Sequence, residues 1–170
     1  RRQQGEARQY IRSADFLSTA DGMHVAFGST SGVVQYGRVE VGAFTKTEMS
    51  TRSLRATRFI TETRIVCGDE SGTIHLLDLT THLVHALDTA VVGITSLRSV
   101  SSSQAILCGY RDGQVKVVYS PVRMRDADFT VDNDGREATV ARAVHTSIVG
   151  DTLQLSDGTV LTCSDDHTIR

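Results

Sequence analysis

Short runs of alternating apolar and polar residues, separated by tight turns, recur along the chain. Near the C-terminus two such runs, Ile148 to Leu155 and Val160 to Cys163, flank a turn at residues 156–158, which is typical of a β-hairpin. A second turn at residues 165–167 leads into a further strand that begins at Thr168. The pattern predicts a meander of strands, which needs further sheets beside it to bury its apolar face.

The central part of this meander occurs four times. Each copy contains two or three apolar residues, a small residue, a short polar turn and another apolar strand, and the copies span residues 25–34, 65–74, 106–115 and 161–169. The position of the small residue recurs after 40, 41 and 54 residues, at Gly28, Gly68, Gly109 and Cys163. A repeat of about 40–45 residues with four strands is typical of a β-propeller blade. The sequence therefore predicts an all-β fold built from about four blades.

The repeat spacing also predicts the domain organisation. We expect a linker or the tail of a preceding strand at residues 1–10, followed by blades at about 11–50, 51–90, 91–143 and 144–170. The third blade carries an expected insertion at 122–143, with a hairpin around the turn at 132–135. In the first blade, Val39 to Phe44 is the expected fourth strand. No segment shows sustained helical periodicity.

The four units resemble WD repeats over nearly the whole chain. In that family a His before the first strand, a Ser or Thr in the second, an Asp in the next turn and a Trp in the third form a hydrogen-bonded tetrad. By this resemblance the last unit supplies the first three of these residues as His145, Thr162 and Asp166. The third unit has Cys108 and Asp112 in the Ser and Asp positions. The Trp-Asp pair of the family is Leu77-Asp78 in the second unit, and the chain has no Trp. The repeats are thus degenerate, and we expect them to depend more on apolar packing.

The ends of the chain bear on the size of the propeller. The chain begins at Arg1 rather than Met, and its fourth unit stops at Arg170 within the expected third strand. An open arc of blades would expose a long strand edge, which natural proteins avoid. A WD ring most often has seven blades, as the resemblance implies, so we expect the chain to be part of a larger ring.

Composition and charge narrow the function classes. A net charge of −2 and a pI near 6.3 argue against a protein wholly devoted to nucleic acid. No apolar run reaches 18 residues, so membrane insertion is not expected, and the N-terminus lacks the apolar region of a signal peptide. The three cysteines occur one per unit and are interpreted as small buried hydrophobes, which favours an intracellular compartment, cytoplasm or nucleus.

Metal and catalytic sites are disfavoured. The acidic segment 132–135 lacks the first carboxylate and the final Glu of a calcium loop, so a plain turn is the better interpretation. His82 and His85 would point to opposite faces of a strand, and no Cys-x-x-Cys pair exists. The set of His145, Thr162 and Asp166 superficially resembles a catalytic triad, but no nucleophile elbow or oxyanion-hole motif accompanies it. We therefore expect no metal or cofactor and no enzyme activity.

A rigid platform for other proteins of a multi-subunit complex is the function that the resemblance implies. The loops after the second strands are the expected partner surface, with the candidate residues Asp69, Glu70, Tyr110, Arg111 and Asp165. Tyr110 and Arg111 are favoured because Tyr and Arg are enriched in binding hot spots. The basic region from Lys46 to Arg64 indicates an alternative, an acidic partner or RNA held by Arg52, Arg55 and Arg58. Phe59 is the one aromatic there, which makes nucleic acid the secondary hypothesis.

Overall fold

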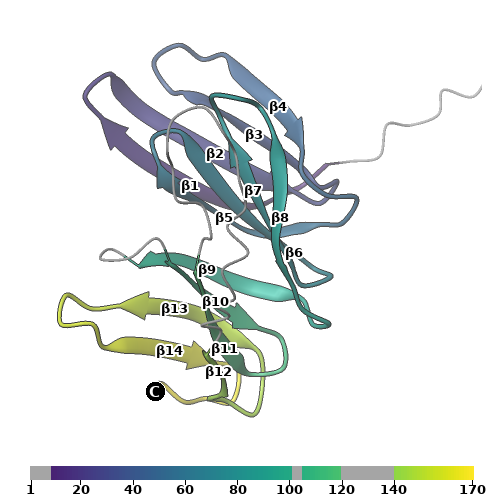
Figure 1. The fold of residues 1–170 in the computed structure, drawn as a ribbon, viewed down its shortest axis with the longest axis vertical. Helices are drawn as coiled ribbons and strands as arrows, with labels where there is room; N and C mark the ends of the chain where they lie inside the picture. The colour runs from purple at the N-terminus through teal and green to yellow at the C-terminus, as the bar shows by residue number, and fades with distance from the viewer. Residues whose placement is uncertain (1–8, 101–104, 120–139) are drawn as a thin grey trace, which may run out of the picture.

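A computed structural model describes residues 9–100, 105–119 and 140–170, and this part of the chain contains fourteen strands and no helix (Figure 1). The first eight strands are β1 (Ile11–Thr19), β2 (Gly22–Ser29), β3 (Val33–Arg38), β4 (Phe44–Glu48), β5 (Leu54–Thr61), β6 (Arg64–Asp69), β7 (Thr73–Asp78) and β8 (Val84–Thr89). The remaining six are β9 (Ile94–Val100), β10 (Ala105–Tyr110), β11 (Gln114–Tyr119), β12 (Val140–Ala143), β13 (Val149–Gln154) and β14 (Val160–Ser164).

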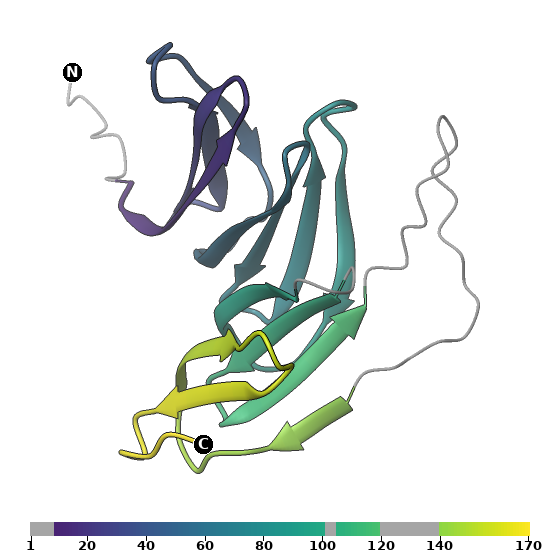
Figure 2. The same cartoon turned by 90° about the vertical axis from the view of Figure 1, so that its left-hand side faces the viewer.

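The strands form successive antiparallel meanders, as predicted. Three sheets have four strands each, in the orders β1-β2-β3-β4, β5-β6-β7-β8 and β9-β10-β11-β12, and β13 pairs with β14 in the fourth. We call these sheets blades 1 to 4. The first strands of successive blades, β1, β5, β9 and β13, lie next to one another, and the sheets fan out from them (Figures 1 and 2). The fold is a β-propeller with four blades in this chain.

Blade 4 is shorter than the others in the part of the chain described. Beyond β14 the backbone turns at His167 and makes a single antiparallel bridge from Ile169 to Cys163. The backbone of Arg170 exchanges two hydrogen bonds with Thr162, at 2.8 and 2.9 Å. The third strand expected to begin at Thr168 is therefore represented by a single bridge at Ile169.

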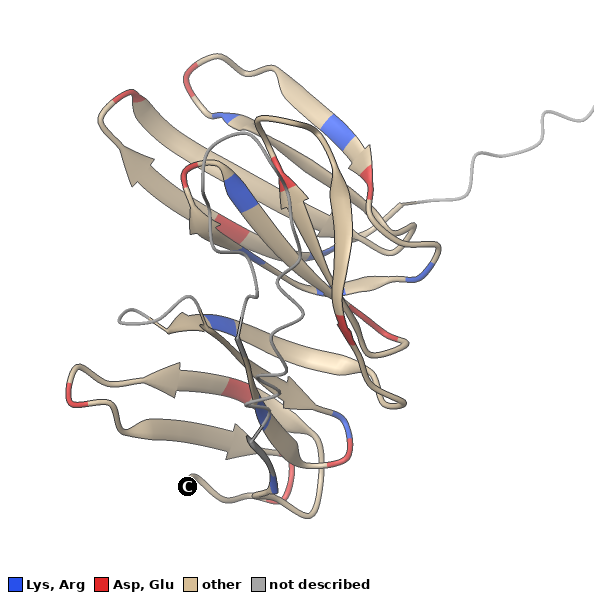
Figure 3. Ribbon diagram, viewed as in Figure 1, with Lys and Arg blue, Asp and Glu red and all other residues tan. Residues whose placement is uncertain are grey.

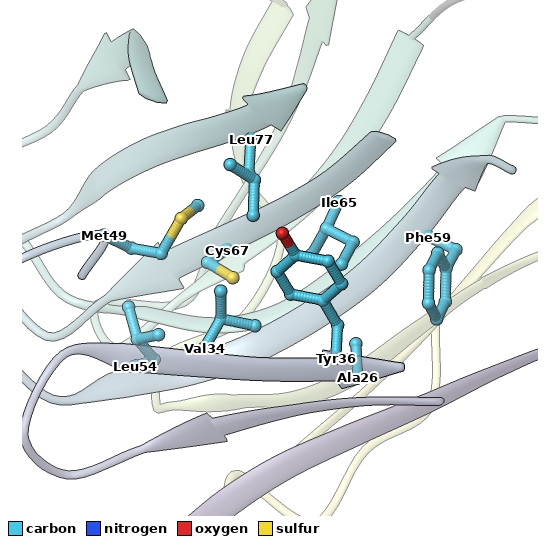
Figure 4. Packing of buried hydrophobic residues seen from close by; sticks show 9 residues of the cluster. All are labelled: Ala26, Val34, Tyr36, Met49, Leu54, Phe59, Ile65, Cys67 and Leu77. Atoms are coloured by element: carbon cyan, nitrogen blue, oxygen red, sulfur yellow. The ribbon is translucent and has the colours of Figure 1, made fainter. Parts of the chain in front are cut away.

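The core lies between blades rather than within one sheet. The first cluster joins β2 and β3 of blade 1 to β5, β6 and β7 of blade 2, where Val34 and Tyr36 face Ile65, Cys67 and Leu77 (Figure 4). A second cluster joins blades 2 and 3, and a third joins blade 3 to Val149 of blade 4. Because burial of apolar area is the main stabilising term, each blade is held chiefly by its neighbours.

The glycine of each repeat permits this close packing. A Cβ at Gly68 would lie 2.6 Å from Cγ2 of Ile94, and one at Gly109 would lie 2.7 Å from Cγ1 of Val149. Gly28 stands in the same way against Leu54 at the start of β5, with 3.1 Å to its Cβ. The repeated small residue is thus the place where the first strand of the next blade crosses.

Three expectations about the elements were wrong. The fourth strand of blade 1 is Phe44–Glu48 and not Val39 to Phe44, because the turn through Gly42 (φ 68°) pairs Gly37 with Phe44. Residues 140–143 of the expected insertion are the outer strand of blade 3, paired with β11. The hairpin expected around 132–135 lies outside the described residues. Finally, Cys67 and Cys108 are buried as expected, but Cys163 is exposed because no described blade packs over it.

Candidate functional site

Three side chains from separate elements of blade 4 meet in one hydrogen-bonded network. His145 precedes β13, Thr162 lies in β14, and Asp166 lies in the turn after β14. The Nε2 atom of His145 is 2.7 Å from the Thr162 hydroxyl, and its Nδ1 atom is 3.0 Å from Oδ2 of Asp166. Because a carboxylate can only accept, Nδ1–H is the donor to Asp166. The structure thus brings together the three residues that the resemblance assigned to one tetrad.

Thr168 is a fourth member that the sequence analysis missed. Its hydroxyl donates to Oδ1 of Asp166 at 2.7 Å and lies 3.1 Å from Nδ1 of His145. This hydrogen bond is the main reason that the pKa of Asp166 is held well below its usual range; partial burial opposes it, and the Thr146 N–H and His145 add to it. The Asp-x-Thr spacing across a tight turn is the sequence signal that could have indicated Thr168.

The network fits a structural role. His145 and Thr162 are both buried, and the Thr162 hydroxyl is occupied by His145 at 2.7 Å. A catalytic hydroxyl has to reach a substrate as well as its base, and this one faces the interior of the blade. The arrangement fastens the segment before β13 to the turn after β14.

The corresponding positions in blade 3 do not form such a network. Cys108 is buried, its thiol lies 3.7 Å from the carbonyl of Ile106, and burial raises its pKa. Asp112 accepts a hydrogen bond from the Gln114 N–H at 3.1 Å and so caps its own turn. In the described residues these two candidates belong to separate contacts, and Ala90 occupies the backbone position that corresponds to His145.

Blade 2 has a different network, centred on Asp69. The carboxylate accepts from the hydroxyl of Ser71 at 2.6 Å and of Ser50 at 2.8 Å, and lies 2.9 Å from Nε2 of His75. Burial alone would raise the pKa of Asp69, but the hydrogen bonds from Ser71, His75, Ser50 and the Thr73 N–H outweigh it and lower the pKa to about 2. The alternating polar residues at 69, 71, 73 and 75 are the signal for this network, which the sequence analysis did not use.

Asp69 and Tyr110, two of the five expected partner-binding residues, are buried. Asp69 is 1% exposed and Tyr110 is 3% exposed. Both end a second strand, and the Asp69 carboxylate is enclosed by the hydrogen-bond donors of its own network. Tyr110 packs in the second core cluster, and burial raises its pKa. The expectation that the Tyr110 ring contacts a partner is therefore corrected: it is a core residue.

The other three candidates share one rim of the propeller. Glu70, Arg111 and Asp165 each follow a second strand, and each donates its N–H to the residue that precedes the first strand of its blade, at 3.0, 3.1 and 3.0 Å. Repetition of this hydrogen bond places the three residues at equivalent positions of blades 2, 3 and 4. Arg111 and Asp165 are exposed and Glu70 is half-buried. The rim therefore presents a row of alternating charge.

The basic region varies in burial along its length, and Figure 3 shows Lys and Arg spread over several strands. Lys46 on β4 and Arg52 in the following loop are exposed, whereas Arg64 is buried and lies 3.5 Å from the carboxylate of Asp78. Arg55 and Arg58 lie on β5, the innermost strand of blade 2. Of the three arginines proposed to bind an acidic partner or RNA, Arg55 and Arg58 line one groove together and Arg52 does not line it.

The described residues contain no group of three or more His, Cys, Asp or Glu arranged to hold a metal ion. His82 lies in a turn, and its Nδ1 atom is 3.3 Å from the Tyr36 hydroxyl of the neighbouring blade. His85 lies in strand β8. The segment considered for calcium lies outside the described residues. Among these residues there is also no helix long and apolar enough to span a bilayer.

Comparison with known proteins supports the fold. No protein-family model matches the chain, and no curated protein matches it. Among solved structures, the computationally designed Ika4 protein is 20% identical with a TM-score of 0.69, and the match covers 98% of this chain and 92% of that one. The computationally designed Ika8 protein is 19% identical (TM-score 0.70; 94% and 44% covered). A chain in the crystal structure of the Mitotic Checkpoint Complex is 16% identical (TM-score 0.71; 92% and 44% covered). This chain thus spans less than half of the last two.

Proposed function

We propose that this chain is a non-catalytic, WD-repeat-like platform that binds other proteins within a larger intracellular assembly. The observation that carries the proposal is the rim of Glu70, Arg111 and Asp165, which three blades present at equivalent positions of a rigid scaffold. Charged residues on a preorganised surface give specificity and fast association at little ordering cost. The similarity to a chain of a multi-protein checkpoint complex supports a scaffold role at the level of the fold.

The engagement of the blade 4 side chains with one another supports the non-catalytic part of the proposal. The hydroxyl of Thr162 and the imidazole of His145 are engaged with each other in the interior. The thiols of Cys67 and Cys108 are also buried, and burial raises the pKa of Cys67 to about 12, which makes its thiolate rare at neutral pH.

The experiment compares the partners recovered with two matched triple variants. The first replaces the rim residues by alanine (Glu70→Ala, Arg111→Ala, Asp165→Ala), and the second replaces three exposed charges elsewhere with the same charge change (Lys46→Ala, Glu48→Ala, Glu62→Ala). We expect a defined set of proteins to be recovered with the wild type and the second variant but to weaken by at least about tenfold with the first, a loss typical of hot spots. Recovery of the same set with both variants would contradict the proposed surface.

Binding measurements on the same purified protein distinguish the alternative hypothesis, an RNA-associated propeller, from the protein-binding platform. If Arg52, Arg55 and Arg58 neutralise phosphates, replacing all three should weaken RNA binding and reduce its salt slope by about 0.7 for each phosphate that is no longer neutralised. Tight, salt-sensitive RNA binding by the purified chain, with no protein recovered, would favour that alternative over the scaffold.

A further inference from the structure

The innermost strands of all four blades contribute to one polar groove. It has a volume of about 240 Å³, and β1, β5, β9 and β13 line it with residues that include Arg12, Arg55, Arg58, Thr95, Ser96 and Asp151. These strands lie side by side, so the groove crosses from blade 1 to blade 4 on the inner wall of the propeller (Figures 1 and 2). It adjoins the rim of Glu70, Arg111 and Asp165, since Arg55 contacts Glu70, but none of the three rim residues lines it.

Positive charge in the groove exceeds negative charge. The carboxylate of Asp151 is already paired with Arg98, whose Nη2 atom lies 2.8 Å away and whose Nε–H donates to the carbonyl of Thr152. Arg55 has one long contact to a carboxylate, 3.4 Å from Nη2 to Glu70. Among the described residues, no carboxylate forms an ion pair with Arg12 or Arg58.

Arg58 is held in place by neutral groups. Its Nη1 atom donates to the carbonyl of Ala14 at 3.1 Å and to that of Thr57 at 2.8 Å, so that one guanidinium bridges β1 and β5. Burial lowers its pKa, the neighbouring Arg98 lowers it further, and Asp15 and Asp151 oppose both. A fixed guanidinium close to a second one is a site where an added anion relieves repulsion and loses little side-chain entropy on binding.

We infer that this groove binds an acidic peptide segment, one or two of whose carboxylates pair with Arg12, Arg55 and Arg58. Its size fits one or two side chains rather than a whole cofactor, since drug-sized ligands occupy about 300–1,000 Å³. No aromatic residue lines it, so bases could not stack there as they do in single-stranded RNA sites. Guanidinium groups and hydroxyls match carboxylate acceptors.

This inference rests on the proposed function, since it names a chemical class of partner for the platform, but it concerns residues other than the three of the rim. The test measures fluorescence anisotropy of a labelled peptide of ten glutamates on the purified chain, with a labelled ten-nucleotide poly(U) RNA in parallel. The groove variant is Arg55→Gln with Arg58→Gln. The control is Lys46→Gln with Arg52→Gln, which removes the same charge from exposed positions outside the groove.

We expect the groove variant to weaken peptide binding at least about tenfold and the control variant to weaken it less than about twofold. Equal losses in both variants, tighter binding of poly(U) than of the peptide, or no peptide binding at about 1 mM would each overturn the inference. Arg12→Gln, on an exposed side chain of β1, provides the same test if the double variant fails to fold. Failure here with recovery still dependent on Glu70, Arg111 and Asp165 would reject the groove and leave the proposed function standing.

Discussion

The imidazole of His145 and the hydroxyl of Thr162 form a 2.7 Å hydrogen bond between side chains that are both buried. One residue precedes the first strand of blade 4, and the other lies in its second strand, so the bond fastens the segment before β13 to β14. A buried donor or acceptor that loses its partner costs free energy that water cannot restore. The bond therefore offers a direct measure of what this polar network contributes to the stability of a blade.

His145→Ala should lower the free energy of unfolding by about 1–3 kcal/mol, because it leaves buried partners without their hydrogen bonds. Urea denaturation followed by circular dichroism measures the change. In a double-mutant cycle with Thr162→Val, the two losses should be less than additive, since each variant removes the same bond. Strictly additive losses would show that the two side chains do not interact.

Acid should weaken blade 2 through Asp69. Hydrogen bonds lower its pKa from 3.8 to about 2 in the folded chain, so below pH about 4 the unfolded chain binds more protons than the folded one. The stabilisation is fully present above the unfolded pKa and is lost as the pH falls from about 4 through about 2. Asp69→Asn cannot titrate, so its urea midpoint should fall less steeply over this range than that of the wild type. Parallel curves would contradict the prediction.

Gly68→Ala should destabilise the chain by about 1–3 kcal/mol, because the new methyl group would lie 2.6 Å from Ile94 and force blades 2 and 3 apart. Gly150→Ala is the matched control: its new Cβ would meet Cys163 at 3.6 Å, an ordinary contact. Thermal unfolding of both variants measures the difference. Ile94→Ala removes Cγ2 and Cδ1, so it should cost less stability in the Gly68→Ala background than in the wild type. Equal costs in the two backgrounds would mean that the clash is elsewhere.

Tyr110→Ala should act on stability and not selectively on binding. Removal of this buried ring from the second core cluster should cost about 3–5 kcal/mol. Arg111→Ala, one residue further on, is exposed and should change the unfolding free energy by less than about 0.5 kcal/mol. A stable Tyr110→Ala variant that no longer binds its partner would reverse the assignment of Tyr110 to the core.

The repeat period and the strand order could be predicted from the sequence, because turn residues and alternation recur in register. The three residues of the blade 4 network were expected from the resemblance to WD repeats. The residue at which each strand ends could not be predicted from the sequence. Tyr110 and Asp69 look like turn residues in the sequence, yet each is the last residue of its strand and is buried. The burial of Tyr110 depends on a core shared by two blades, which local patterning does not contain.

The fourth strand of blade 1 shows the same limit. Val39 and Val41 are apolar and predicted a strand, but both are exposed around the turn at Gly42. The strand instead uses Phe44–Glu48, whose polar residues face solvent at the outer edge. Pairing with β3, fixed by the length of the turn, outweighs hydrophobicity at an outer strand. The Asp69 network was missed because its donors are far apart in the sequence, Ser50 before β5 and His75 in β7.

Each core cluster belongs to two successive blades, and this sets how the chain should come apart. Among the described residues, blade 1 shares one core cluster with a neighbour and blade 2 shares two, so opening blade 2 breaks more of this packing than opening blade 1. Amide hydrogen exchange should be slowest in β6 and β10, whose side chains are buried throughout. It should be faster in β1 and β4, which carry many exposed residues. A glycine that lets two sheets touch thus also determines which of them unfold together.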